Sequence, residues 1–116
     1  MAVGDGRLPI LRPVPGVQLG TVSAGIKTAG RKDLVLIAAD EGTTAAAVFT
    51  RNAFCAAPVT VAREHLERCG YQPRYLLVNT GNANAGTGVA GIAAARTCSQ
   101  AVASATGVPP ESVLPF

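Results

Sequence analysis

The stretch of the chain with the clearest chemical potential is residues 79–88, Asn-Thr-Gly-Asn-Ala-Asn-Ala-Gly-Thr-Gly. Its glycines can adopt positive φ, and asparagine tolerates that region better than most residues. Such a backbone can turn consecutive N–H groups toward one point. A predicted helix follows, whose first N–H groups lack partners and whose dipole favours negative charge. These residues therefore predict a site for an anion, either a permanent one such as phosphate or the transient oxyanion of acyl transfer.

Two common phosphate motifs do not match this loop. The phosphate loop of nucleotide enzymes requires Gly-Lys followed by Ser or Thr, but no lysine follows Lys32. The dinucleotide fingerprint Gly-x-Gly-x-x-Gly is not contained within residues 79–88, and no acidic residue follows the loop until Glu111. The residues leave three hypotheses open: part of an acyl-transfer enzyme, a strand–loop–helix module that binds phosphate or a nucleotide without catalysis, and a purely structural subunit.

The other candidate nucleophiles and ligands stand apart from one another. Cys55, Cys69 and Cys98 are irregularly spaced, and the single histidine, His65, is not placed to complete a metal set with them. We therefore expect no metal site, and reduced, mostly buried thiols in a cytoplasmic protein. Cys55 has no visible base partner. His65 is expected to be a partly exposed helical residue and not a catalytic base.

Composition narrows the class of protein. Of the 116 residues, 48% are hydrophobic and 15% are charged, which argues against disorder. Only 4% are aromatic, so the core would consist of small aliphatic side chains that pack against another unit. The net charge of +3 is scattered, without a basic stripe for nucleic acid. No signal peptide and no apolar run of membrane-spanning length is visible, so we expect neither nucleic acid nor membrane as a partner.

The first half of the chain is organised around two predicted strands. Residues 1–16 are rich in Gly and Pro and predict an N-terminal arm. Residues 17–26 have a loose strand pattern, and the apolar run 34–39 predicts a strand that is covered on both faces. After a turn at 40–42, residues 45–50 are the predicted hairpin partner of that strand.

A short amphipathic helix is predicted to begin at Pro58, because proline suits the first helical position. Its Glu64 and Arg68 are four residues apart in the order that favours an ion pair. The apolar face carries Val59, Ala62 and Leu66, and the polar face carries Arg63, Glu64, Glu67 and Arg68.

Residues 75–107 are predicted to form the strand–loop–helix unit that carries the loop. The strand is 75–78 and the helix is 89–106, ended by Gly107 as a C-cap. Arg96 is the only charge on this helix, which predicts burial on most of its sides.

The loop at 79–88 resembles the characteristic loop of the ornithine acetyltransferase family, whose members act as glutamate N-acetyltransferases. The resemblance runs from Val14 to the end of the chain in matching order. The ten-residue loop is specific, whereas the upstream matches are weak singly and persuasive together. Those matches are Ala24-Gly-Ile-Lys27, Asp33-Leu, Ala47-Val-Phe-Thr-Arg-Asn52 and Ala56-Ala-Pro-Val59.

The resemblance implies an α/β fold, a layered sandwich of the DmpA/ornithine acetyltransferase-like kind that is related to the N-terminal-nucleophile type. Residues 1–116 would be the N-terminal fragment of the alpha-chain domain, so the fold would be incomplete in this chain. The implied activity belongs to arginine biosynthesis, in the cytoplasm. Acetyl passes from N2-acetylornithine to a threonine nucleophile and then to glutamate.

The resemblance also implies partners and cofactors. Family precursors cleave themselves autocatalytically before the nucleophilic threonine, which becomes the N-terminus of a beta chain. The expected assembly is an alpha2beta2 heterotetramer that contains the remaining alpha-chain segment. No metal or prosthetic group takes part, although some members accept acetyl-CoA as a co-substrate.

For the site, the resemblance implies that Thr87 and Gly88 form the oxyanion hole. Thr87 would donate through its hydroxyl, and Gly88 through its backbone N–H. Asparagine side chains readily bond to nearby backbone, so the other polar residues and glycines of the loop are expected to support its shape. These loop-supporting residues are Asn79, Gly81, Asn82, Asn84 and Gly86. The match at Lys27 is taken as structural.

The chain departs from the family pattern at its C-terminal side. The self-cleavage segment and the substrate-binding residues of the second chain are absent, and family members usually continue past Phe116 with Ser-Thr-Gly. Residues 112–116 are an apolar run without an evident partner, which suggests that the polypeptide continues. We therefore expect a fragment that does not catalyse the exchange alone, because it lacks an activated nucleophile.

Overall fold

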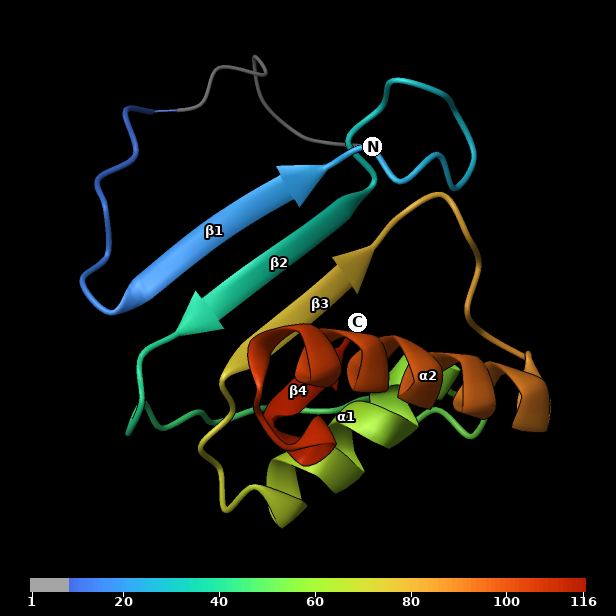
Figure 1. Ribbon diagram of the computed structural model, residues 1–116. Coiled ribbons are helices and arrows are strands. Elements are labelled where there is room, and N and C mark those ends of the chain that lie inside the picture. The colour runs from blue at the N-terminus through green and yellow to red at the C-terminus, as the bar shows by residue number, and fades with distance from the viewer. Residues whose placement is uncertain (1–8) are drawn as a thin grey trace.

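The computed structural model describes residues 9–116, which form one four-stranded sheet and two α-helices (Figure 1). Half of the predicted N-terminal arm, residues 1–8, lies outside the described residues. Residues 9–16 contain no strand or helix and lead into the first strand.

The sheet has the strand order β1-β2-β3-β4. Strand β1 (Val17–Val22) pairs antiparallel with β2 (Leu34–Ala39), and β2 pairs antiparallel with β3 (Tyr75–Asn79). Strand β4 (Val113–Pro115) then pairs parallel with β3. The parallel pair is possible because a helix crosses over between β3 and β4.

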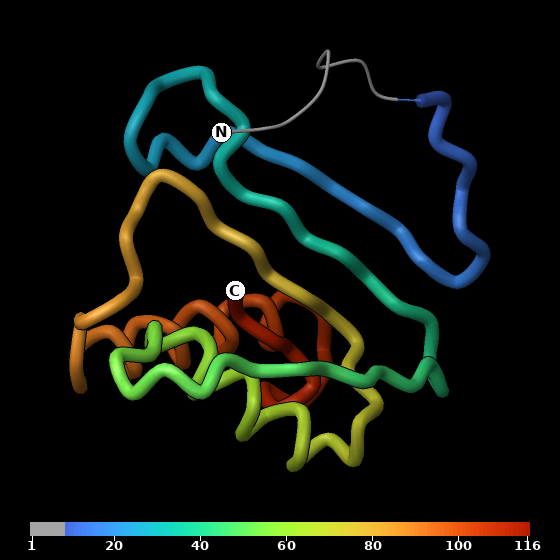
Figure 2. Tube along the Cα trace, turned by 180° about the vertical axis from the view of Figure 1, so that it is seen from behind, coloured from blue at the N-terminus to red at the C-terminus, as the bar shows by residue number. Residues whose placement is uncertain are grey.

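The predicted hairpin partner at residues 45–50 is wrong. Both edges of β2 are already occupied by β1 and β3, so no edge remains for a third strand. Residues 43–56 instead run without a strand from the end of β2 to the first helix, which is visible from behind in Figure 2. The N–H of Ala45 donates to the carbonyl of Tyr71 at 2.9 Å, and Phe49 packs against the core.

Helix α1 (Ala57–Arg68) begins with proline in its first turn, and Glu64 pairs with Arg68 at 2.9 Å, as predicted. His65 differs from the prediction because it is buried, not partly exposed. Its Nδ1 lies 2.8 Å from the carbonyl oxygen of Val113. The reason is tertiary: α1 packs on β4, and His65 lies on the packed side.

Helix α2 (Gly88–Thr106) ends as predicted at Gly107, whose φ of 74° is left-handed and whose N–H donates to Ala103 at 2.8 Å. The expected burial on most sides is wrong, because only Ala95, Ser99 and Ala103 are buried. One stripe of the helix contacts α1 and β4, and most of the remaining positions are exposed.

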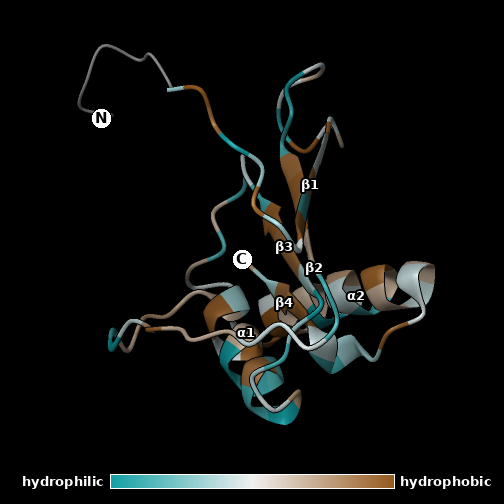
Figure 3. Cartoon of the chain, turned by 90° about the vertical axis from the view of Figure 1, so that its left-hand side faces the viewer, coloured by the Kyte–Doolittle hydropathy of each residue, from teal (hydrophilic) through white to brown (hydrophobic). Residues whose placement is uncertain are grey.

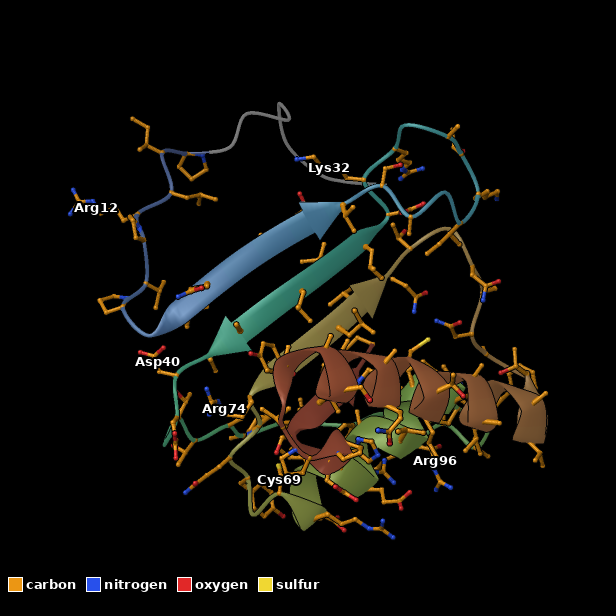
Figure 4. All side chains as sticks on the ribbon, viewed as in Figure 1. Arg12, Lys32, Asp40, Cys69, Arg74 and Arg96 are labelled. Atoms are coloured by element: carbon orange, nitrogen blue, oxygen red, sulfur yellow. The ribbon has the colours of Figure 1, made fainter. Side chains whose placement is uncertain are left out.

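The two helices are also joined by charge. Arg96 of α2, labelled in Figure 4, donates to Glu64 of α1 at 2.7 Å. That hydrogen bond, with the nearby charge of Arg68, holds the pKa of the Glu64 carboxyl below its usual value. This partly exposed ion pair adds a polar contact to the packing of α1 against α2.

The core lies where the helices meet β4, and it contains Ala62, Leu66 and Leu114. The C-terminal run is therefore partnered, contrary to the prediction, because β4 pairs with β3 and is covered by the helices. A short 3₁₀ turn, η1 (Pro110–Ser112), leads into it.

Strands β1 and β2 extend away from both helices (Figures 1 and 3). The residues of β1 are exposed and those of β2 are half-buried, so the prediction of a strand covered on both faces is wrong within the described residues. The prediction of mostly buried thiols also fails at Cys98, which is exposed on α2, while Cys55 and Cys69 are half-buried.

Candidate functional site

A chain of side-chain amides braces the loop between β3 and α2. Asn82 Nδ2 donates to Asn84 Oδ1 at 3.0 Å, and Asn84 Nδ2 donates to Asn79 Oδ1 at 3.3 Å. Asn79 Nδ2 in turn donates to the carbonyl of Phe116 at 3.2 Å. The three asparagines thus connect the loop to the residue that follows β4.

The carbonyl of Asn84 connects the loop to both helices. It accepts a hydrogen bond from Thr87 Oγ1 at 2.9 Å and one from the N–H of Ala57, the first residue of α1, at 3.4 Å. An isolated antiparallel bridge between Ala56 and Ala85 adds a second link. As a result, α1 and α2 both begin beside the same loop.

Thr87 and Gly88 lie at the junction of the loop and α2. Gly88 is the first helical residue, and its φ of 59° is a left-handed conformation that favours glycine. The N–H groups of a first helical turn have no acceptor within the helix, so those at the start of α2 are available to an anion. The exposed hydroxyl of Thr87 lies next to them and is directed to Asn84.

The two other glycines of the loop lie close to neighbouring side chains. A Cβ at Gly81 would stand 3.1 Å from the Cβ of Lys27, and the ring of Phe54 occupies the space where Gly86 would carry one. Both glycines have positive φ. The loop therefore approaches Lys27 and Phe54 closely at two positions that carry no side chain.

Asp33 is a buried residue whose importance the sequence did not reveal. Its carboxylate accepts the N–H of Ala24 at 2.6 Å and the N–H of Ile26 at 2.7 Å, and its backbone carbonyl accepts the N–H of Thr80 at 3.0 Å. The backbone hydrogen bond from Ala24 is the main cause that lowers the pKa of this carboxyl. Asp33 thus joins the segment around Lys27 to the loop. The sequence signal that could have pointed to Asp33 is an acidic residue directly before an apolar strand.

We expect Asp33→Asn to remove an acid-dependent part of the stability. A carboxyl whose pKa is lowered by folding stabilises fully above its unfolded value of 3.8, and this contribution is lost as the pH falls through the folded pKa. Asparagine offers one acceptor oxygen in place of two, so one backbone N–H loses its partner at every pH. Thermal unfolding from neutral pH to below 3.8 measures the effect.

The unfolding temperature of the native protein should drop more steeply in acid than that of Asp33→Asn. Asp40→Asn, at an exposed position, controls for the loss of one carboxylate. Parallel curves for the native protein and Asp33→Asn would contradict this role of Asp33.

An open pocket of about 590 Å³ lies beside the loop, between the sheet and α2. The sheet and α2 supply apolar walls, and the loop supplies amides and the Thr87 hydroxyl. None of the lining residues is His, Lys, Arg, Asp or Glu, so no base in the lining could activate a hydroxyl or thiol. The lining residues are Ile26, Leu34, Ala57, Pro58, Leu77, Asn79, Asn82, Asn84, Thr87, Ala90, Gly91, Ala94, Ala95, Cys98 and Pro115.

Within residues 9–116, no group of three His, Cys, Asp or Glu side chains could hold a metal ion. None of the helices in the same range has the length and apolar character needed to cross a membrane.

The fold and the site together define an α/β protein in which a braced Gly/Asn loop presents helix N-terminal N–H groups and a hydroxyl beside an apolar pocket. Residues 18–116 match the ArgJ family, and the chain belongs to this family. It is 56% identical over its whole length to the arginine biosynthesis bifunctional protein ArgJ of Pseudomonas syringae pv. tomato. The chain spans 28% of the length of that relative.

Two solved structures share the fold. The arginine biosynthesis bifunctional protein ArgJ of Bacillus halodurans is 32% identical with a TM-score of 0.81, over 88% of this chain and 52% of that one. The ornithine acetyltransferase of Mycobacterium tuberculosis, solved with ornithine, is 36% identical with a TM-score of 0.78, over 87% of this chain and 54% of that one. These structures confirm the predicted layered α/β class.

Proposed function

We propose that this chain is part of an acetyltransferase of arginine biosynthesis, and that residues 79–88 supply its oxyanion hole. The enzyme moves acetyl from N2-acetylornithine to glutamate through an acetyl-threonine intermediate. Membership of the ArgJ family supports the pathway, and the ornithine bound to the Mycobacterium tuberculosis relative supports the substrate class. The observation that carries the site is local: Gly88 is the first residue of α2 and directly follows Thr87, which lines the pocket.

The proposed chemistry develops negative charge at one oxygen. A threonine hydroxyl on a partner chain attacks the acetyl carbonyl, a C–O bond forms, and the carbonyl electron pair moves to the oxygen. The N–H of Gly88 and the Oγ1–H of Thr87 donate to that oxyanion. When the intermediate collapses, the C–N bond breaks, and the proton given up by the threonine hydroxyl leaves on the amine of ornithine. The amine of glutamate then attacks the acetyl-threonine in the same way and regenerates the hydroxyl.

The proposal requires the Thr87 hydroxyl to change its acceptor. In the resting arrangement its single proton is donated to the Asn84 carbonyl at 2.9 Å. A hydroxyl that turns to the oxyanion must leave that carbonyl. The N–H of Ala57 still donates to the Asn84 carbonyl at 3.4 Å, which limits the free-energy cost of rotating the Thr87 hydroxyl away. The developing charge makes the new hydrogen bond the stronger one.

The proposed partners are the remaining alpha-chain segment and a beta chain that begins with the nucleophilic threonine after autocatalytic cleavage. We place them in an alpha2beta2 heterotetramer in the cytoplasm, where the three free cysteines would stay reduced. No metal or prosthetic group is assigned, and acetyl-CoA is a candidate second acetyl donor. The absence of a base in the pocket lining supports a nucleophile that comes from another chain.

An acetyl-exchange assay tests the proposal. The purified complete assembly is incubated with isotopically labelled N2-acetylornithine and glutamate, and acetylglutamate is measured by mass spectrometry. We expect labelled acetylglutamate and, after acid quenching, an acetylated N-terminal threonine on one chain. An assembly that binds inorganic phosphate but transfers no acetyl would favour the non-catalytic anion-binding alternative. An assembly in which no chain begins with threonine would contradict the proposed nucleophile.

A further inference from the structure

Gly91, the fourth residue of α2, lies directly against the side chain of Thr87. A Cβ at this position would stand 2.6 Å from the Cβ of Thr87 and still closer to its Oγ1. Real Cβ atoms essentially never approach other atoms within 3.0 Å. Threonine is stiff at χ1, and its hydroxyl is held by Asn84, so the side chain cannot swing aside and keep its place. The space above Gly91 is therefore what admits the Thr87 side chain.

This proximity is unusual for a helix and has a local cause. Side chains four residues apart on a regular helix have Cβ atoms roughly 5–6 Å apart. Here the left-handed φ of 59° at Gly88 turns the chain between Thr87 and the helix. Thr87 is thereby folded back over the first turn of α2, where the N–H of Gly91 donates to its carbonyl at 3.2 Å. Glycine lowers the stability of a helix, so we explain its occurrence at position 91 by the space that it leaves for the Thr87 side chain.

We propose that Gly91 is a positioning residue for the acyl-transfer reaction, acting only through Thr87. This inference rests on the proposed function, because it assumes that the Thr87 hydroxyl serves the reaction. Because residue 91 has no side chain, Thr87 can occupy the position from which its hydroxyl reaches both Asn84 and the pocket. The neighbouring Cβ of Ala57 would lie 3.2 Å from a Cβ at 91, a contact that a small shift of α1 relieves. The obstacle is thus the Thr87 side chain and not the packing of the two helices.

A double-mutant cycle in the complete assembled enzyme tests this assignment. The forms are the native enzyme, Gly91→Ala, Thr87→Gly and the double variant, and the readouts are kcat, KM and the unfolding temperature. We expect Gly91→Ala to lower kcat about a hundredfold with little change in KM, because a donor that acts in the transition state is displaced. Thr87→Gly should lower kcat similarly, and the double variant should be no slower than Thr87→Gly. Gly20→Ala, whose Cβ would meet nothing within 4 Å, is the matched control.

The unfolding temperature separates this role from a structural one. Thr87→Gly removes the two Thr87 atoms that a Cβ at 91 would meet, so the double variant should recover most of the unfolding temperature lost in Gly91→Ala. If Gly91→Ala fails to fold, recovery of a folded double variant still supports the assignment, whereas an unfolded double variant overturns it. A native rate in Gly91→Ala, together with a slow Thr87→Gly, overturns the role of Gly91 but leaves the proposed function intact. A native rate in Thr87→Gly overturns the role of Gly91 and the oxyanion role of Thr87, but it leaves the acetyl transfer itself intact.

Discussion

Replacement of Thr87 by alanine is expected to lower kcat of the assembled enzyme by roughly 100- to 1000-fold while the assembly stays folded. The hydroxyl donates to an oxygen that carries negative charge only in the tetrahedral intermediate. Its loss therefore raises the barrier and leaves substrate binding nearly unchanged, so kcat and kcat/KM should fall together. Steady-state exchange of acetyl between N2-acetylornithine and glutamate measures both constants.

Two variants control this experiment. Thr97 is an exposed threonine on α2, and its Oγ1 donates to a backbone carbonyl as that of Thr87 does, here to Ala93 at 2.9 Å. It does not line the pocket, so Thr97→Ala should keep the native rate. Thr87→Ser keeps the donor and should retain most of the activity. If Thr87→Ala matched the Thr97→Ala rate, the oxyanion role of Thr87 would be wrong.

The largest effect on stability is expected for Leu66→Ala, at about 2–5 kcal/mol of the free energy of unfolding. Leu66 is 2% exposed and packs with Ala62 and Leu114, where α1 meets β4. Alanine would leave a cavity that these small neighbours cannot fill. Urea unfolding of the variant and the native protein measures the difference, as a lower midpoint at an unchanged slope.

The neighbouring residue on the exposed side of the same helix is the control. Glu67→Ala removes a side chain of similar length from solvent and should change the free energy of unfolding by about 0.5 kcal/mol or less. Equal effects at Leu66 and Glu67 would show that the contact between α1 and β4 is not the core of this unit. The orientation of the loop at the start of α2 would then rest on other contacts.

Local elements were predictable because their causes are local. Proline in the first turn of α1, the apolar run of β3 and Gly107 after α2 act within a few residues of their own positions. The anion-binding potential of residues 79–88 is local in the same sense, because it follows from glycine, asparagine and a helix that comes next. These features were visible without knowledge of any distant contact.

Partners of each element were less predictable because pairing depends on distant residues. An apolar run such as β2 does not specify whether its neighbour is residues 45–50 or β3. In the structure β2 pairs with β3 across five residue pairs. Helical periodicity places His65 on α1 but does not predict that β4 packs over this residue and buries it. The exposure of most of α2 likewise could not be predicted from its composition.

The amino-acid sequence by itself determined most of the helices and strands and the loop at 79–88, and its resemblance to a family supplied the two candidate donors, since each depends on residue types at short spacing. The tertiary structure alone decided which groups meet there. It placed the Asp33 carboxylate under residues 24–26, the Asn84 carbonyl between two helix starts, and the Thr87 side chain over Gly91. The contacts of Asp33 and of Asn84 with Ala57 depend on chain reversals and strand order, which join residues that no local pattern relates. The approach of Thr87 to Gly91 depends instead on the left-handed φ at Gly88.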